Sequence, residues 1–172
     1  MSRTIRTKVY KFEELSSEAQ SKAIEDNWDW NVTDEWWQFT YDDAENIGLK
    51  IKGFDIDRGS YCKGDFTLSA NEVSQNIFNN HGEECETYKT AKSFMDEWQP
   101  IFNDYIDENS EGYESGENET KLQDIENDFL TNILEDYRII LTKEYEYLTS
   151  KESIKDMLIV NALEFTQDGR RF

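Results

Sequence analysis

The amino-acid sequence predicts an α+β fold, a small antiparallel sheet with a central hairpin (about 49–57 and 61–68) covered by several helices. Three observations predict it: helical periodicity dominates the chain, two alternating segments flank a glycine turn, and only one proline interrupts the pattern. Aromatic residues make up 14% of the 172 residues, which allows a sizeable core despite a mean hydropathy of -0.86. Without a repeat or a linker in the sequence, we expect a single domain, residues 1–172.

The expected elements alternate between short strands and helices, with one long helix near the C-terminus. In order, they are a strand, two helices, two strands, four helices and a final strand, at about 4–12, 17–28, 34–47, 49–57, 61–68, 69–81, 86–107, 119–148, 151–162 and 163–172. Residues 107–119 have no apolar periodicity and predict a loop.

Polar residues mark most of the expected helix ends. Ser17 with Gln20, and Ser69 with Glu72, have the spacing of capping boxes. Ser150 marks the start of the last helix in the same way, because its hydroxyl can accept a bond from the first turn.

The second helix is expected to begin after an N-cap at Thr33 and to end at Gly48. Pro100 is expected to kink or divide the helix at 86–107, because proline lacks a backbone N–H. Trp28 and Trp37 fit the buried stripes of the first two helices. The places of Trp30 and Trp36 are less obvious, and an exposed tryptophan would suit a protein interface.

The segment Gly53–Phe66, GFDIDRGSYCKGDF, resembles the start of a calcium loop, but the sixth and twelfth positions hold Ser60 and Phe66 where glycine and glutamate are required. A hairpin with a three-residue loop at 58–60 explains it better. The expected pairs are Asp57 with Tyr61, Ile56 with Cys62, Asp55 with Lys63, Phe54 with Gly64, Ile51 with Phe66 and Leu49 with Leu68, the last two requiring a bulge at Gly53. Asp55 and Lys63 would form an ion pair, and Cys62 would be a buried thiol.

The net charge of -20 comes from two segments. Residues 12–48 hold eleven acidic residues against Lys22, and residues 93–128 hold twelve against Lys121. This charge disfavours binding to bare nucleic acid or to anionic membranes, and it favours a basic partner. Solvated helix faces would give the same composition, so charge alone leaves both explanations open.

Catalytic chemistry finds little support in the sequence. His81 with Cys85 lacks an orienting group, and a histidine at the end of a helix is the simpler interpretation. No glycine-rich phosphate loop, dinucleotide fingerprint or metal-ligand set is present. We therefore expect no enzyme, no catalytic residue, no metal and no cofactor.

Neither a membrane span nor a secretory signal is evident. No run of about 18 apolar residues occurs, and the basic N-terminus MSRTIRTKVYKF lacks an apolar core. The two cysteines lie 23 positions apart and suit free thiols. These features predict an intracellular, cytoplasmic protein.

The segment VYKFEELSSEAQSKAI at 9–24, together with GFDIDRGSYCKGDF and LEDYRIILTKEYEYLTS, resembles a family of small acidic proteins encoded by phages and prophages. The resemblance spans most of the chain and implies a phage origin, but it transfers no catalytic residue. Small acidic phage proteins without enzymatic activity are often inhibitors of host defence, of the anti-CRISPR or antirestriction type. By analogy, this implies a DNA-mimic-like protein that binds a nuclease or another nucleic-acid-binding complex.

The candidate partner-binding residues therefore lie on the acidic helices and in the predicted loop. They are Asp34, Glu35, Trp36, Asp42, Asp43, Glu45, Asp96, Glu97, Asp104, Asp107, Glu108, Glu111 and Glu114. An antitoxin-like or regulatory binding module is the alternative, in which a basic N-terminal arm makes the contact. That arm comprises Arg3, Arg6, Lys8 and Lys11.

Overall fold

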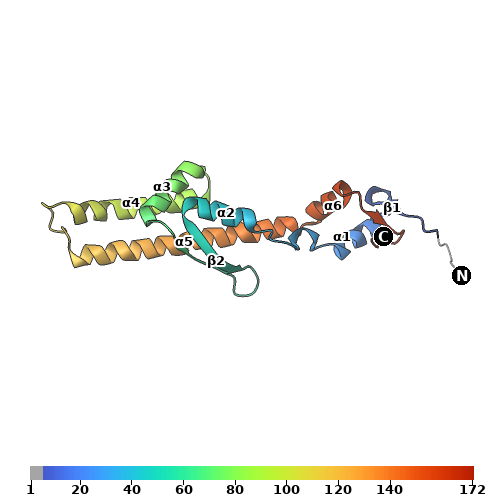
Figure 1. The fold of residues 1–172 in the computed structure, drawn as a ribbon, viewed down its shortest axis with the longest axis horizontal. Coiled ribbons are helices and arrows are strands. Elements are labelled where there is room, and N and C mark those ends of the chain that lie inside the picture. The colour runs from blue at the N-terminus through green and yellow to red at the C-terminus, as the bar shows by residue number, and fades with distance from the viewer. Residues whose placement is uncertain (1–5) are drawn as a thin grey trace. The chain divides into compact units, whose positions relative to one another are not determined.

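The computed structural model describes residues 6–172 and confirms the α+β class (Figure 1). Within these residues, six α-helices accompany two separate antiparallel sheets of two strands each. The elements in order are β1 (Tyr10–Lys11), η1 (Phe12–Glu14), α1 (Ser17–Asp26), η2 (Trp30–Val32), α2 (Gln38–Ile47), β2 (Leu49–Asp55), β3 (Tyr61–Phe66), α3 (Ala70–Asn80), α4 (Glu86–Ile106), α5 (Gly116–Leu148), α6 (Lys151–Val160) and β4 (Glu164–Phe165). Arg3 of the predicted basic arm and Ile5 of the predicted first strand lie outside the described residues.

The described residues divide into two compact units. The terminal unit comprises residues 6–36 and 143–172, and the central unit comprises residues 37–142. Each unit has a hydrophobic cluster of its own. The organisation of the whole chain as one domain stays a prediction.

The terminal unit pairs the two ends of the described chain. β1 and β4 are antiparallel, with Tyr10 opposite Phe165. The first strand is shorter than expected, because residues 6–9 are not paired in a sheet and the chain turns into η1 at Phe12. The ring of Phe12 is buried against Phe165. The tail forms the predicted turn: Gly169 has a φ of +84°, and Phe165 bridges back to Arg171.

α1 begins as expected, but its cap differs from the prediction. The N-cap is Ser16, whose Oγ accepts a hydrogen bond from the Ala19 amide at 3.3 Å. Gln20 is not part of a capping box, because its side-chain amide donates to the Phe12 carbonyl oxygen at 3.1 Å. The helix ends at Asp26, so Trp28 lies beyond the buried stripe and is 50% exposed, contrary to the prediction.

α2 starts four residues later than the sequence predicts. Trp37 occupies the N-cap, while Thr33 donates its hydroxyl proton to the Trp30 carbonyl oxygen at the end of a short 3₁₀ turn. Gly48 ends the helix as expected, with a φ of +92° that favours glycine. Trp37 is half-buried and packs edge-on against Phe54, with 5.7 Å between ring centroids.

The β2–β3 hairpin is confirmed, but its predicted register is wrong by two residues over most of its length. Cys62 pairs with Phe54, and Phe66 pairs with Leu49. The loop is longer than predicted because two local hydrogen bonds form within it. The Asp55 carboxylate accepts a hydrogen bond from the Asp57 amide at 2.7 Å, and the Asp57 carbonyl oxygen accepts one from the Ser60 amide at 3.1 Å. A register shift of two residues leaves most side chains on the face of the hairpin where they were predicted, and Leu49 is buried.

The irregularity expected near Gly53 is present between Ile51 and Gly53. The predicted ion pair between Asp55 and Lys63 is wrong, since Asp55 faces Tyr61. The Lys52 ammonium instead pairs with the carboxylate of Asp65.

α3, α4 and α5 complete the central unit. The capping box of α3 is confirmed, because the Glu72 carboxylate accepts from the Ser69 amide at 3.0 Å. α4 runs through Pro100 as one helix, so of the two predicted effects of this proline, a kink or a division, the division does not occur. The buried rings of Phe94 and Trp98 anchor the preceding turns, which offsets the one backbone hydrogen bond that proline cannot make.

α4 and α5 lie side by side and run in opposite directions (Figure 1). α5 begins at Gly116, three residues earlier than predicted, and ends at Leu148 as predicted. The core of the central unit consists mainly of side chains from these helices, α2, α3 and β2: Ala44, Ile47, Leu49, Ile51, Ala70, Val73, Ile77, Ala91, Phe94, Trp98, Phe129, Ile133 and Tyr137.

Candidate functional site

The thirteen candidate residues divide between the two units. Asp34, Glu35 and Trp36 belong to the terminal unit, and the other ten belong to the central unit. Within the central unit, three lie on α2, three on α4 and four in the loop that joins α4 to α5. α4 and this loop therefore form the largest group of candidates within one unit.

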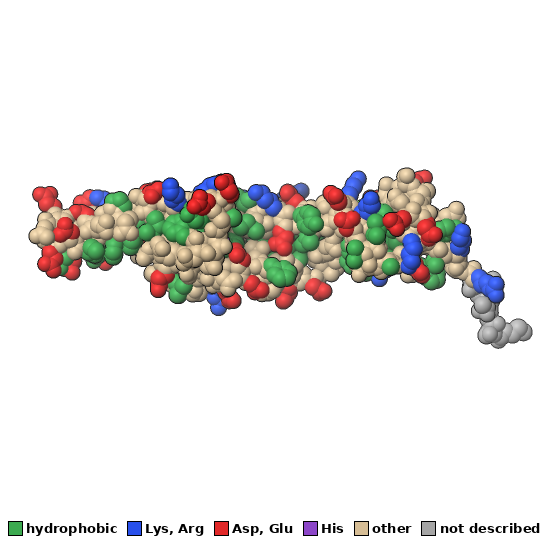
Figure 2. Space-filling model, turned by 90° about the horizontal axis from the view of Figure 1, so that it is seen from above, with side chains coloured by type: hydrophobic (Ala, Val, Ile, Leu, Met, Phe, Trp, Pro, Cys, Tyr) green, Lys and Arg blue, Asp and Glu red, His purple; other side chains and the backbone are tan. Residues whose placement is uncertain are grey.

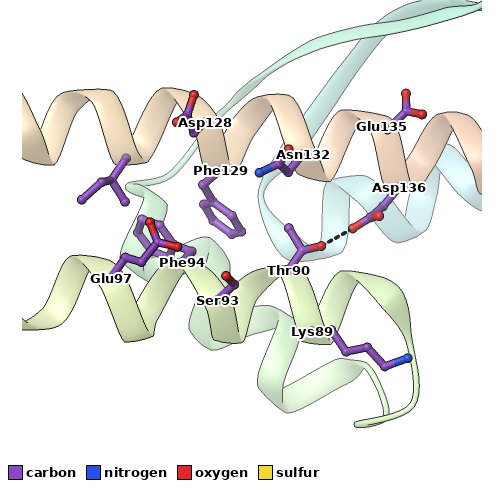
Figure 3. A pocket seen from close by; sticks show the side chains of 11 residues that line it. Lys89, Thr90, Ser93, Phe94, Glu97, Asp128, Phe129, Asn132, Glu135 and Asp136 are labelled. Carbon is purple, nitrogen blue, oxygen red and sulfur yellow. Dashed lines mark hydrogen bonds between the residues drawn. The ribbon is translucent and has the colours of Figure 1, made fainter.

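A groove lies between α4 and α5, with a cavity volume of about 380 Å³ (Figure 3). Its apolar lining consists of Phe94, Ile125 and Phe129. The rings of Phe94 and Phe129 are stacked, with centroids 4.2 Å apart and planes inclined by 12°. Both side chains are buried, so they form a rigid floor.

Four carboxylates line this groove: Glu97 from α4, and Asp128, Glu135 and Asp136 from α5. Among the described residues, neither Glu97 nor Asp128 has a hydrogen-bond or ion-pair partner. Glu135 accepts two hydrogen bonds from Arg138, at 2.6 and 2.7 Å, and this hydrogen bonding lowers the pKa of Glu135.

Asp136 is the most enclosed of these carboxylates. Its Oδ2 accepts a hydrogen bond from the Thr90 hydroxyl at 2.7 Å, across the groove from α4 (Figure 3). Burial raises the pKa of Asp136 above its usual value, and the neighbouring charges of Glu86 and Glu135 add to this effect. A cation near Asp136 would therefore relieve a desolvated negative charge.

The remaining groove residues are polar. The side chains of Ser93 and Asn132 lie beside the stacked rings, one from each helix (Figure 3). Lys89 is the one cation of the lining, and its ammonium already pairs with Glu86 at 2.8 Å. The lining thus has an uncompensated negative charge.

The loop at 107–115 is fixed by the carboxylate of Asp104. Its Oδ2 accepts from the side-chain amide of Asn118 at 2.7 Å, and Oδ1 accepts from the Ser110 hydroxyl. Asn118 also donates to the Gly112 carbonyl oxygen, and a Cβ at Gly112 would overlap Asp104. Asp104 therefore has a structural role in presenting the acidic loop.

Asp43 likewise has an internal role. Its Oδ2 accepts a hydrogen bond from the buried Tyr137 hydroxyl at 2.7 Å, and its Oδ1 lies 3.4 Å from Nε2 of His81. His81 is the expected C-cap of α3, and its Nδ1 lies 2.7 Å from the Thr87 hydroxyl. The contact with His81 lowers the pKa of Asp43, and the bond from Tyr137 contributes. Burial raises the pKa of Tyr137 above its usual value.

Trp36 is half-buried, with its ring 5.6 Å from that of Tyr145. The other candidates are exposed: Asp34, Glu35, Asp42, Glu45, Asp96, Glu97, Asp107, Glu108, Glu111 and Glu114. The sequence pattern did not identify Asp128, Glu135 and Asp136 as site residues. The available signal was the apolar helical stripe that includes Ile125 and Phe129, but its pairing with the side of α4 that carries Phe94 depends on how α4 and α5 pack.

Nucleophilic and metal chemistry have few candidate groups here. Cys62 is half-buried, and burial raises the pKa of its thiol to about 11, which keeps it protonated near neutral pH. In residues 6–172, no three histidine, cysteine or acidic side chains gather where they could hold a metal ion. Over the same residues, no helix has both the length and the apolar character required to cross a membrane.

The chain matches no family model, no curated protein and no solved structure. Function is therefore inferred from the groove, the acidic loop and the charge distribution.

Proposed function

We propose that this chain is a phage-encoded inhibitor of a bacterial defence system, of the anti-CRISPR or antirestriction type. It binds stoichiometrically to the basic nucleic-acid-binding surface of a host nuclease complex, in the host cytoplasm. The contact is made by α4, the first half of α5 and the loop between them, which together are called the acidic face below. The mechanism is occupancy of the surface, without a catalytic step or a cofactor.

The observation that supports this proposal most directly is the exposure of the carboxylates at 93–128. Eleven of the twelve acidic residues in this segment are exposed, and Lys121 is the one basic residue among them. Figure 2 shows acidic side chains at the end of the α4–α5 pair that holds the loop. A charge excess of this size repels polyanions and attracts basic surfaces.

The charge density is comparable with that of a nucleic acid. A DNA duplex presents about one negative charge per 1.7 Å of its axis. Helical residues rise by about 1.5 Å each, so the five carboxylates within residues 116–128 of α5 give about one charge per 4 Å, close to the one per about 3.4 Å of a single strand. α4 is sparser, with three carboxylates within residues 93–106. Phosphate-binding arginine and lysine residues of a nuclease would thus meet a similar row of anions.

The phage origin rests on the resemblance of residues 9–24 and the two later segments to phage and prophage proteins. It directs the search for a partner toward defence nucleases.

Capture of the partner tests the proposal. The full-length chain, immobilised and exposed to lysate of a bacterium with restriction and CRISPR systems, should retain a nuclease complex at low salt. The purified chain should then inhibit DNA binding by that nuclease at a one-to-one ratio, with an inhibition that weakens as salt increases. Recovery of no nucleic-acid enzyme, or inhibition at far below one copy per nuclease, would contradict it.

The antitoxin-like alternative depends on the basic arm. In the described part of the arm, Arg6 and Lys8 are exposed, whereas Lys11 donates to the Ala162 carbonyl oxygen at 2.6 Å and pairs with Glu164. Deletion of residues 1–8 separates the two functions. The inhibitor keeps its partner after the deletion, while a module that binds through the arm loses it.

A further inference from the structure

The groove between α4 and α5 combines two features that rarely serve the same ligand. Its floor is the stacked pair Phe94 and Phe129, and its rim bears carboxylates of both helices. A neutral apolar ligand would leave the carboxylates without partners, and a small hydrated cation would gain nothing from the rings. A long side chain with an apolar stem and a cationic end satisfies both features, because the stem covers the apolar floor while the charge meets the carboxylates.

The negative charge of the groove is available for a ligand. Glu97 and Asp128 have no partner among the described residues, whereas Lys89 and Glu135 are already paired with Glu86 and Arg138. Asp136 shares its carboxylate with Thr90 alone. Three carboxylates on the two helices are therefore free to accept further hydrogen bonds.

Size also suits a side chain. The volume of about 380 Å³ lies at the lower end of the range of ligand pockets, roughly 300–1,000 Å³. Ser93 and Asn132 offer further oxygen acceptors beside the rings (Figure 3). A guanidinium has five donors in one plane and is weakly hydrated, so it can bond to carboxylates of both helices at once, whereas an ammonium is compact and strongly hydrated.

We propose that this groove receives an arginine side chain of the basic partner, with its aliphatic stem along the apolar floor and its guanidinium bonded to Glu97 and Asp128. This site deepens the proposed function and rests on it, because the nucleic-acid-binding surface of a nuclease is where exposed arginines gather. The groove then adds geometric selectivity to a contact that the loop makes through charge alone.

Titration with two short peptides tests the site without a known partner. The isotopically labelled full-length chain is titrated with acetyl-Gly-Arg-Gly-amide or acetyl-Gly-Lys-Gly-amide at low salt, and amide shifts are followed by NMR. The arginine peptide should give saturable shifts confined to residues 89–97 and 125–136. The lysine peptide should bind at least about fivefold more weakly, because its ammonium is strongly hydrated and lacks the planar set of donors.

A pair of matched variants isolates the groove from the general charge. Glu97→Gln with Asp128→Asn removes two charges from the rim, and Glu119→Gln with Asp124→Asn removes two exposed charges of α5 outside the lining. The first variant should lose most of the arginine response, and the second should keep it within about twofold. All four side chains are exposed, so both variants should fold.

Equal binding of the two peptides, shifts spread over the loop at 107–115, or equal loss in both variants would overturn the groove proposal. These outcomes are separate from the capture experiment. A nuclease captured equally well by the groove variant would leave the inhibitor proposal intact and exclude the arginine site. An arginine-selective groove without a captured nuclease would do the reverse.

Discussion

Two segments of this chain have almost the same acidic excess but very different structural settings. Residues 93–128 lie wholly within the central unit, and nearly all of their carboxylates are exposed on α4, α5 and the loop between them. Residues 12–48 are divided between the two units, and one of their carboxylates, Asp43, is engaged by Tyr137 and His81. Two segments of nearly equal charge can therefore expose different numbers of unpaired carboxylates, because packing decides which carboxylates remain available.

The largest expected effect on the free energy of unfolding comes from removing the buried phenylalanine ring of each segment. Phe94 and Phe12 are 4% and 2% exposed, and they belong to the central and terminal clusters respectively. Phe94→Ala and Phe12→Ala should each lower the free energy of unfolding by about 3–5 kcal/mol, since each leaves a cavity in a buried cluster. Urea denaturation with fluorescence detection measures the loss.

The same two variants also test the organisation of the chain. If the two units unfold together, each substitution should increase hydrogen exchange throughout residues 6–172 by a similar factor. If each unit unfolds by itself, exchange should increase only in the unit that contains the substituted ring. A loss below about 1 kcal/mol for either ring would contradict its role as an anchor.

A smaller effect is expected at Asp43, with its neighbour Asp42 as a control. Asp43→Asn removes the charge that faces His81 and weakens the bond from Tyr137, so the free energy of unfolding should fall by about 1 kcal/mol, given that the side chain is half exposed. Asp42 is exposed, and Asp42→Asn should change it by less than about 0.5 kcal/mol. Equal losses in both variants would mean that the Tyr137–Asp43–His81 contacts contribute nothing specific.

The contribution of Asp43 should also depend on pH. Its pKa is lower in the folded chain than its ordinary value of 3.8, so the unfolded chain binds the proton more readily in acid. The advantage of the wild type over Asp43→Asn should be complete above pH 4 and should disappear as the pH falls through the lowered value. Unfolding free energies of both proteins from pH 6 down to pH 2.5 measure this, and a difference that grows in acid would contradict the assignment.

The smallest effect on stability is expected from removing exposed carboxylates, because such a change can weaken partner binding without changing the free energy of unfolding. Glu108→Gln with Glu111→Gln in the loop, and Glu25→Gln with Asp26→Asn on α1, each remove two exposed charges. Both variants should unfold within about 0.5 kcal/mol of the wild type. Only the loop variant should bind the captured nuclease more weakly and with a shallower salt dependence. Equal weakening by the α1 variant would move the contact away from the acidic face.

Local chemistry in the sequence was sufficient to predict much of the fold. The capping box at Ser69, the C-terminal stop at Gly48 and the turn at Gly169 depend on interactions within a few residues, and all three are present. Long stripes such as that of α5 are similarly local, because one face of a helix repeats every three to four residues. The charge excess of both segments also follows from composition alone.

Where two local preferences compete, the sequence was a poor guide. The N-cap of α1 is Ser16 and not the predicted Ser17. The register of the hairpin differs from the prediction because the Asp55 side chain closes a turn that favours a longer loop. Trp28 is predicted to be buried on α1, but the helix ends before this residue and its side chain is exposed. Pro100 did not divide α4, because the buried rings before it hold the helix in place.

The sequence by itself determined the fold class, most of the helices and the two acidic segments, since each depends on residues that are neighbours along the chain. Only the tertiary structure decided which carboxylates are available. Packing of α4 against α5 placed Asp136 opposite Thr90 and enclosed a groove over Phe94 and Phe129. These contacts join residues more than thirty positions apart, and their pairing depends on the relative rotation of two helices, which periodicity does not specify.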